Sequence, residues 1–260
     1  MIIASLTSYP KRISHCDYVI ANFMESQTVK PDIFYFWLSV QDFPNKEKDL
    51  PTSLLGVIKN YNIRLMWTQN NEYCCKRWNV YPMHLNDYCI FIDDDVVYSS
   101  TIIEDALNVL KKHPDSICNL WRQYTGKPIF DGVKRVDWQY LDDEKSTQHW
   151  MQGNCMIPPG IFPMEAFKPD LIALRNTFFP SCDEVWLNPI IFKHKIPISY
   201  VPTLTKFMAF KDSLAEGVHM TNELTYGRDL IQKDVNLFIE LAYLNLVEDY
   251  NKVFGYKLKK

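Results

Sequence analysis

Short apolar runs alternate with helix-length amphipathic segments through the first hundred residues. The runs are rich in Ile, Val, Phe and Tyr, which is typical of buried strands, and they lie at Met1 to Leu6, Ile33 to Val40, Ile63 to Trp67 and Tyr88 to Ile92. Strands that alternate with helices predict a parallel sheet with helices on both faces. We therefore expect an α/β, Rossmann-like fold, whose ligands bind at the carboxyl ends of the strands.

Four helices are predicted in the first part of the chain. Their expected bounds are Ser14 to Gln27, Pro51 to Asn60, Cys75 to Leu85 and Thr101 to Lys112. Ser14 is a suitable N-cap, Pro51 suits a first helical turn, and His113-Pro114 ends the fourth helix because proline disfavours helical backbone before it.

The second part of the chain has a less regular pattern. Residues Gly126 to Gly160 resemble a site-forming insertion more than a linker. Ser181 can cap a helix with the sequence CDEVWLNPIIFKH, which we expect Pro189 to kink or end, and a last helix is predicted from Asp229 to Tyr250. We expect one domain over 1–260.

Composition excludes several classes of protein. The chain has 260 residues, 47% of them hydrophobic, so it can bury a sizeable core. Its 28 basic and 31 acidic residues give no basic excess, and we expect no nucleic-acid partner. The chain contains no GxGxxG and no GxxxxGK[ST], so the dinucleotide fingerprint and the Walker phosphate loop are absent.

Cysteine use and apolar run lengths bear on location. The seven cysteines lie mostly in apolar stretches without CxxC spacing, which favours reduced core thiols over a disulfide framework or a zinc site. The first residues do not resemble a signal peptide, and no apolar run approaches the ~20 residues of a membrane span. We expect a cytoplasmic protein with at most peripheral membrane association, at the inner face of the membrane; its oligomeric state stays open.

Three consecutive carboxylates follow the fourth predicted strand, in the segment YCIFIDDDVVYSS. If the backbone stays extended after Ile92, the side chains of Asp93 and Asp95 project to one side and that of Asp94 to the other. Two carboxylates at the mouth of a cleft form a hard oxygen site that suits Mg²⁺ or Mn²⁺. The structural alternative is that one aspartate caps the next helix and another pairs with Lys or Arg.

Three motifs in order resemble one family. The string IDDDVVY resembles the DxD motif of GT-A fold, nucleotide-sugar-dependent glycosyltransferases, IIASLTSYPKRI is similar to the start of a bacterial polysaccharide or capsule group with SLTSYPxRI, and CDEVWL resembles that group's acidic pair before Trp. The three motifs span most of the first 190 residues, and the last 60 add little.

The resemblance implies that residues 1–100 form a nucleotide-sugar-binding half, with the donor site, and that residues 101–260 form an acceptor-side half with the C-terminal helix. Asp95 would ligate Mn²⁺ or Mg²⁺ at the diphosphate, and Asp93 would contact the ribose, or the metal through water. Thr7, Tyr9 and Arg12, on the loop after the first strand, would hold the base, ribose or diphosphate.

Two further residues are assigned to this nucleotide-sugar-binding set. Asp94 belongs to it by its place in the motif, although an extended chain would point its side chain away from the cleft, where it would serve structure. Lys76 matches a position where related sequences carry Lys; a solvated helix face at Lys76 and Arg77 is an equal alternative.

The resemblance also implies a catalytic base and an acceptor side. One of Asp183 and Glu184 would take the proton of the acceptor hydroxyl in an inverting displacement, while both would also be favourable at a helix N-terminus. Trp150 and Gly153, in HWMQGNCMIPPG, would contact a sugar ring, although a single Trp is more often a core residue. In this sequence Ile157 replaces the family's Tyr.

A third metal ligand remains open. His219 in EGVHM is one candidate, and Asp229 is another, although a lone His is more often an ordinary core or surface residue.

The sequence thus favours a metal-dependent transferase that moves a sugar from a UDP-sugar to a polysaccharide or lipid-linked oligosaccharide. A metal-dependent phosphoryl-transfer or hydrolase enzyme is weaker, because Val97 stands where aspartate phosphatases need Thr. The third possibility is a non-catalytic carbohydrate-binding protein, which would bind glycan without nucleotide.

Overall fold

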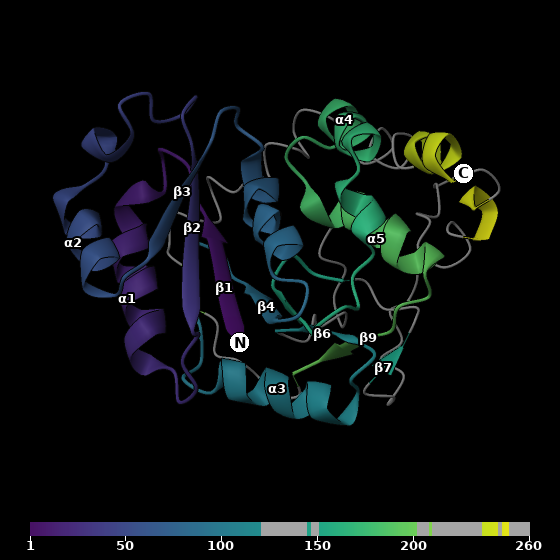
Figure 1. Cartoon of the computed structure of the whole chain (residues 1–260), viewed down its shortest axis with the longest axis horizontal. Coiled ribbons are helices and arrows are strands. Elements are labelled where there is room, and N and C mark those ends of the chain that lie inside the picture. The colour runs from purple at the N-terminus through teal and green to yellow at the C-terminus, as the bar shows by residue number, and fades with distance from the viewer. Residues whose placement is uncertain (121–144, 147–150, 202–207, 210–235, 244–245, 250–260) are drawn as a thin grey trace.

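The computed structural model describes residues 1–120, 145–146, 151–201, 208–209, 236–243 and 246–249. Its main feature is an eight-stranded mixed sheet in the order β3-β2-β1-β4-β8-β6-β9-β7 (Figure 1). The first four strands by position are β3 (Arg64–Thr68), β2 (Ile33–Ser39), β1 (Ile2–Thr7) and β4 (Tyr88–Phe91), and they are parallel to one another. These are the four strands that the apolar runs predict.

The other half of the sheet mixes directions. Strand β8 (Cys155–Ile157) pairs antiparallel with both β4 and β6 (Ile117–Asn119). Strand β6 is parallel to β9 (Ile198–Tyr200), which pairs antiparallel with β7 (Lys145–Ser146). A separate two-stranded ribbon joins β5 (Val96–Val97) to β10 (Met208–Ala209). The antiparallel β8 brings the segment around Gly153 beside the carboxyl end of β4.

Helices α1 (Cys16–Ser26), α2 (Thr52–Asn60) and α3 (Ile102–Lys112) pack on one face of the sheet. Their core contains Ile20, Phe23, Leu54 and Ile103 together with alternate strand residues Ala4, Leu6, Phe34 and Phe36. The opposite strand residues, Ile3, Tyr35 and Trp37, face the second core. This alternation of buried positions confirms a sheet covered on both faces.

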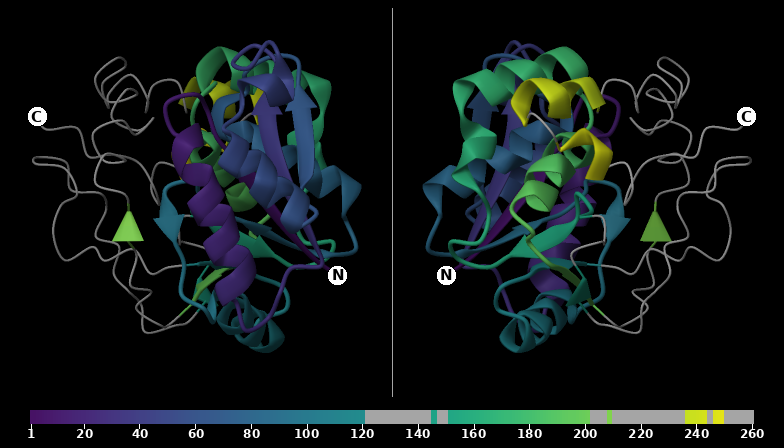
Figure 2. Two further views of the ribbon diagram at one scale, coloured as in Figure 1. Left: turned by 90° about the vertical axis from the view of Figure 1, so that its left-hand side faces the viewer. Right: turned by 90° about the vertical axis from the view of Figure 1, so that its right-hand side faces the viewer.

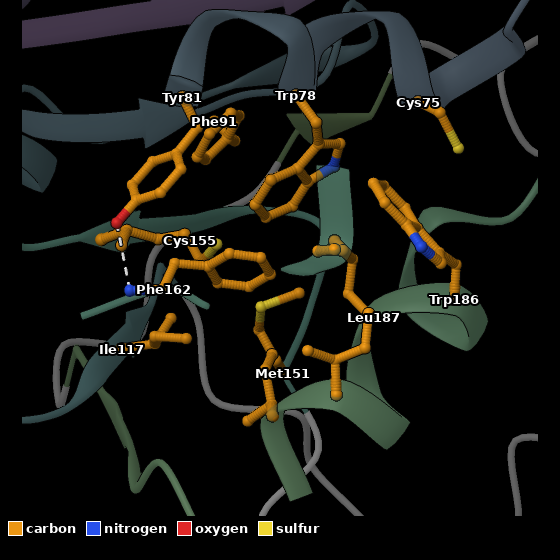
Figure 3. Packing of buried hydrophobic residues seen from close by; sticks show 14 of the residues in the cluster. Cys75, Trp78, Tyr81, Phe91, Ile117, Met151, Cys155, Phe162, Trp186 and Leu187 are labelled. Carbon is orange, nitrogen blue, oxygen red and sulfur yellow. Dashed lines mark hydrogen bonds between the residues drawn. The ribbon is translucent and has the colours of Figure 1, made fainter. Parts of the chain in front are cut away.

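The second face carries the 3-10 helix η3 (Tyr73–Met83), η4 (Met164–Phe167), α4 (Pro169–Phe178) and α5 (Asp183–Lys193). Trp78 of η3 stacks on Phe91 with ring centroids 4.0 Å apart, and the Tyr81 hydroxyl accepts the Phe162 backbone N–H at 3.0 Å (Figure 3). The helical residues 236–242 lie beside α4 and α5 (Figure 2). Phe238 of this segment is buried, and its ring contacts that of Phe179.

Several predicted helix boundaries need correction. A 3-10 turn (Ile13–His15) precedes α1, so His15 and not Ser14 is its N-cap. In place of the α-helix predicted from Cys75 to Leu85, the structure has the 3-10 helix η3 from Tyr73 to Met83. Helix α5 begins after Cys182 and not after Ser181. It also continues through Pro189 to Lys193, because Trp186, Leu187 and Ile190 are fully buried and hold it against the core.

The predicted last helix is also interrupted. Of residues 229–250, the structure describes helix at 236–242 and 247–249, with a bend at Tyr243. Leu237 and Leu241 of the predicted apolar stripe are exposed, whereas Phe238 and Ile239 are buried. None of the helices in the described ranges is long and apolar enough to cross a membrane.

Candidate functional site

The aspartate triplet lies at the carboxyl end of β4, in the middle of the sheet. The strand ends at Phe91, Ile92 is still fully buried, and the chain turns at residues 94–95 before β5. The turn corrects the expectation that Asp93 and Asp95 share one side. The side chain of Asp93 contacts Arg77, whereas Asp94 and Asp95 both contact Arg12.

Arg77, on η3, joins the triplet to the acidic pair. Its Nε and Nη2 donate to Asp183 Oδ2 at 3.1 and 2.7 Å. Its Nη1 donates to the Asp93 carboxylate and, at 3.2 Å, to the backbone carbonyl of Ile92. The Arg77 side chain is only 5% exposed, so its charge is balanced almost entirely by these protein groups.

The remaining groups of Asp93 are also held in place. Asn154 Nδ2 donates to the second carboxylate oxygen of Asp93, and the Asp93 backbone N–H donates to the Tyr98 hydroxyl at 2.9 Å. Tyr98 in turn donates to Asn154 Oδ1. Asp93 is therefore oriented by β8, η3 and the segment after β5, while about a third of its side chain stays exposed at 30%.

Arg12 organises the other side of the triplet. Its Nη1 lies 3.1 Å from Asp94 Oδ1 and 3.0 Å from Asp95 Oδ2, and its guanidinium lies over the Tyr9 ring. The buried Ser8 hydroxyl donates to Asp94 Oδ2. Asp94 thus ties the loop after β1 to the triplet.

The two sides differ in charge balance. Burial raises the pKa of Asp95 to about 7, and the neighbouring charges of Asp93 and Asp94 add to this effect, against the opposing charge of Arg12. Burial also raises the pKa of Asp94, while Arg12 and Ser8 oppose it. Negative charge is therefore in excess around Asp95, which is the condition that a cation relieves.

Asp183 and Glu184, the first two residues of α5, occupy different environments. Burial alone would raise the pKa of Asp183, but the charge of Arg77 and hydrogen bonds from Trp78 and Arg77 hold it below its ordinary value. Trp78 Nε1 donates at 2.7 Å to the oxygen that Arg77 contacts, and the Glu184 N–H donates to the other at 3.1 Å. Glu184 is less buried, and its Oε1 accepts the Gly153 N–H at 3.0 Å.

Gly153 fits against this network because it lacks a side chain. A Cβ at this position would lie 2.3 Å from Arg77 Nη2 and 3.3 Å from Asp183 Oδ1. The groups that approach Gly153 closely in the structure are the side chains of Arg77 and Asp183, and its contact with a sugar ring stays a prediction.

The structure also places the other predicted residues. Thr7 Oγ1 donates to the Trp37 carbonyl at 2.8 Å, at the neighbouring strand end. Lys76 is buried, its Nζ lies 2.9 Å from Asn71 Oδ1, and burial lowers the pKa of its ammonium group. The alternative of a solvated helix face is therefore wrong for both Lys76 and Arg77.

Some predicted residues lie outside the described ranges, namely Trp150, His219 and Asp229. Within those ranges, no group of three His, Cys, Asp or Glu side chains is arranged to hold a metal ion by itself. Sequence reasoning missed Ser8, Tyr98 and Asn154, and it gave Arg77 no role in joining the two acidic motifs. The available signal was the position of Arg77 in the stretch CCKRWNVY, which is rich in apolar residues. An Arg that becomes buried in such surroundings needs an acidic partner.

Comparison with known proteins gives the fold. No family model matches the chain, and no curated protein sequence matches it. Among solved structures, S. aureus TarS 1-349 in complex with UDP-GlcNAc is similar, with a TM-score of 0.57 and 14% identity over 97% of this chain and 70% of that one. S. aureus TarS 1-349 without a named ligand has a TM-score of 0.51 and 11% identity, over 97% and 69% of the two chains. The chain therefore has a GT-A type α/β fold, as predicted.

Proposed function

We propose that this protein is a glycosyltransferase that uses a nucleoside-diphosphate sugar, with UDP as the nucleotide. The observation that carries the proposal is the joining of the strand-terminal aspartates to the acidic start of α5 through Arg77. The similar fold of TarS, which was solved with UDP-GlcNAc, supports this choice of donor. The acceptor would be a surface polysaccharide or lipid-linked oligosaccharide of the capsule type, reached from the cytoplasmic side of the membrane.

The residues present fit a divalent cation. Asp95 offers hard carboxylate oxygens in a region of excess negative charge, as its raised pKa indicates, and Mg²⁺ or Mn²⁺ prefers such donors. Asp95 would be the direct ligand, and His219 stays a candidate for another. Asp93 already binds Arg77 and Asn154, so its contact with the metal would pass through water. When bound, the ion would stabilise the charge of the leaving diphosphate.

Glu184 is the better candidate for the catalytic base. Asp183 is buried, accepts four hydrogen bonds and has a lowered pKa, so it is a weak base that is already occupied. Glu184 is less buried, and its Oε1 accepts the Gly153 N–H. Its carboxylate would take the acceptor hydroxyl's proton as that oxygen attacks the anomeric carbon opposite the diphosphate, which inverts the configuration.

The loop after β1 would bind the nucleotide beside the triplet. Thr7 lies at the end of β1, and Arg12 is fixed by Asp94 and Asp95 with Tyr9 beneath it. A guanidinium in this position would supply positive charge next to the diphosphate. Lys76 would complete the nucleotide side at the ends of β2 and β3, where its ammonium contacts Asn71.

The test is titration calorimetry with UDP, with and without Mn²⁺, followed by a screen of UDP-sugars for slow hydrolysis. We expect UDP to bind tightly only with Mn²⁺, and Asp95→Ala to abolish the dependence on metal. Asp170→Ala, at an exposed position in the first turn of α4, is the matched control and should bind as the wild type does. Metal-dependent binding that persists in Asp95→Ala would contradict the metal site, and no binding of UDP by the wild type would contradict the proposed function.

A further inference from the structure

Arg77 occupies an unusual position between two acidic motifs that are far apart in the sequence. Asp93 follows β4, and Asp183 begins α5, 106 positions after Arg77. One planar guanidinium donates to both carboxylates and to the Ile92 carbonyl. Because the fork of the guanidinium is rigid, the two carboxylates cannot move independently without breaking one of these bonds.

The same guanidinium fixes Glu184 through Asp183. Asp183 Oδ1 accepts the backbone N–H of Glu184 at 3.1 Å, and this bond sets the first turn of α5. Glu184 Oε1 then accepts the Gly153 N–H at 3.0 Å. A chain of contacts therefore runs from Asp93 through Arg77 and Asp183 to the carboxylate of Glu184.

The backbone at Gly153 contacts two members of this chain of contacts, Arg77 and Glu184. The backbone of Gly153 passes so near Arg77 Nη2 that a single Cβ would lie 2.3 Å from it. Gly153 also immediately precedes Asn154, which donates to the Asp93 carboxylate. The segment before β8 therefore touches the network at Arg77, Glu184 and Asp93, and a displacement of Arg77 reaches Glu184 by two routes.

We propose that Arg77 is a positioning residue that sets the location of the Glu184 carboxylate relative to the donor-binding aspartates. The inference rests on the proposed function for its kinetic consequence, but the positioning is a property of the protein alone. A base displaced by about 1 Å from the attacking hydroxyl can lower the rate by about a hundredfold. Arg77 thus affects turnover without touching the substrate.

The test compares Arg77→Lys, which keeps the charge but loses the fork, with Arg77→Gln, which loses both. We expect Arg77→Lys to lower kcat by about a hundredfold and to leave the affinity for UDP with Mn²⁺ within about threefold, since Asp95 is paired with Arg12. Arg77→Gln should also move the acidic limb of the pH–rate profile to higher pH, because a positive charge near the base is lost.

The groups around the acidic pair make that pH shift interpretable. Besides Arg77, the charged or titratable neighbours within the described part of the chain include Asp93 and the thiols of Cys74, Cys75, Cys155 and Cys182. A hydrogen bond with Cys75, together with burial, raises the pKa of the Cys74 thiol, and burial raises the pKa of the Cys155 and Cys182 thiols, so these three stay neutral where a carboxylate titrates.

Arg175→Gln is the matched control. Arg175 is also buried, pairs with Glu72 at 2.9 Å and lies over Trp186, but its hydrogen bonds and ion pair in the described part of the chain are not with Asp93, Asp183 or Glu184. This variant should lose stability and keep the wild-type kcat and pH profile. If it changes them as much as Arg77→Lys does, or if Arg77→Lys turns over like the wild type, the positioning role is wrong.

Hydrogen exchange gives a readout that needs no activity. The amides of Gly153 and Glu184 should exchange about tenfold faster in Arg77→Lys and unchanged in Arg175→Gln, since both amides donate within the network. Unchanged exchange at both amides in Arg77→Lys would overturn the inference. If the wild type binds no UDP, the proposed function fails, whereas the exchange result still decides whether Arg77 holds Glu184.

Discussion

The two sides of the aspartate triplet are each built around one arginine, yet they balance charge in opposite ways. Arg77 is enclosed, and its partner Asp183 has a lowered pKa. Arg12 pairs with two carboxylates, as Arg77 does, yet here Asp95 has a pKa raised to about 7. Around Arg77 the carboxylate of Asp183 is stabilised in its charged form by protein groups alone. Around Arg12 the charged form of Asp95 is disfavoured, so this side can accept a cation. One run of three aspartates thus provides both a structural anchor and a candidate cation site.

Among the variants that test this comparison, Asp183→Asn should have the largest effect on the free energy of unfolding. The substitution weakens the balance of a buried guanidinium and should cost about 3 kcal/mol of unfolding free energy at pH 7. The Asp183 pKa is lower in the folded protein, so its stabilisation is present above the unfolded pKa and is lost as pH falls through the folded value. Urea unfolding of the wild type and the variant at pH 7 and below pH 4 measures the loss and its pH dependence. If the variant lost the same free energy of unfolding at both pH values, the proposed charge balance would be contradicted.

Gly153→Ala should have the next largest effect. The added Cβ must displace Arg77 or the backbone, and we expect a loss of about 2 kcal/mol in unfolding free energy together with a loss of turnover. Gly56→Ala is the matched control, because Gly56 lies in α2, where an added Cβ would have no atom within 4 Å, and alanine there should stabilise by ~0.5–1 kcal/mol. Urea unfolding measures the free energy of unfolding of both variants. If Gly153→Ala were as stable as Gly56→Ala, Arg77 would not be tightly held.

Asp95→Asn sharpens the comparison from the Arg12 side. With chelator present, wild-type stability should fall as pH rises from about 4 to 7, because the folded state holds the Asp95 proton more tightly than the unfolded chain does. The Asn variant should lose this dependence and melt about 4 °C higher at pH 8. Mn²⁺ should raise the melting temperature of the wild type alone. Thermal melts across this pH range would reject the idea if both proteins followed one curve.

The smallest effect is expected from Ser8→Ala. Its hydroxyl donates to the buried Asp94 carboxylate, which would keep Arg12 as a partner, so the loss should be about 1 kcal/mol. Urea unfolding measures it, with Ser14→Ala, at an exposed position, as the control with no loss. A cost as large as that of Asp183→Asn would mean that the two sides are equally dependent on internal pairing.

The sequence predicted the regular part of the fold well. Strands β1 to β4 follow from apolar runs, and the place of Asp93 follows from the rule for carboxyl ends of parallel strands. Local patterns failed where tertiary contacts decide. Arg77 depends on Asp183, and the turn at residues 94–95, which redirects Asp95, depends on pairing with the loop after β1. Pro189 is accommodated because the surrounding core holds its helix.

The distance of 106 positions between Arg77 and Asp183 also has a consequence for biosynthesis. A ribosome adds about 5 to 20 residues each second, so Arg77 and the aspartate triplet emerge several seconds before the residue that completes their pairing. Strands β1 to β4 can pair during that interval, since all of them precede residue 92. The nascent chain would then carry Arg77 with one of its two acidic partners, Asp93, and synthesis of α5 would supply the second, Asp183.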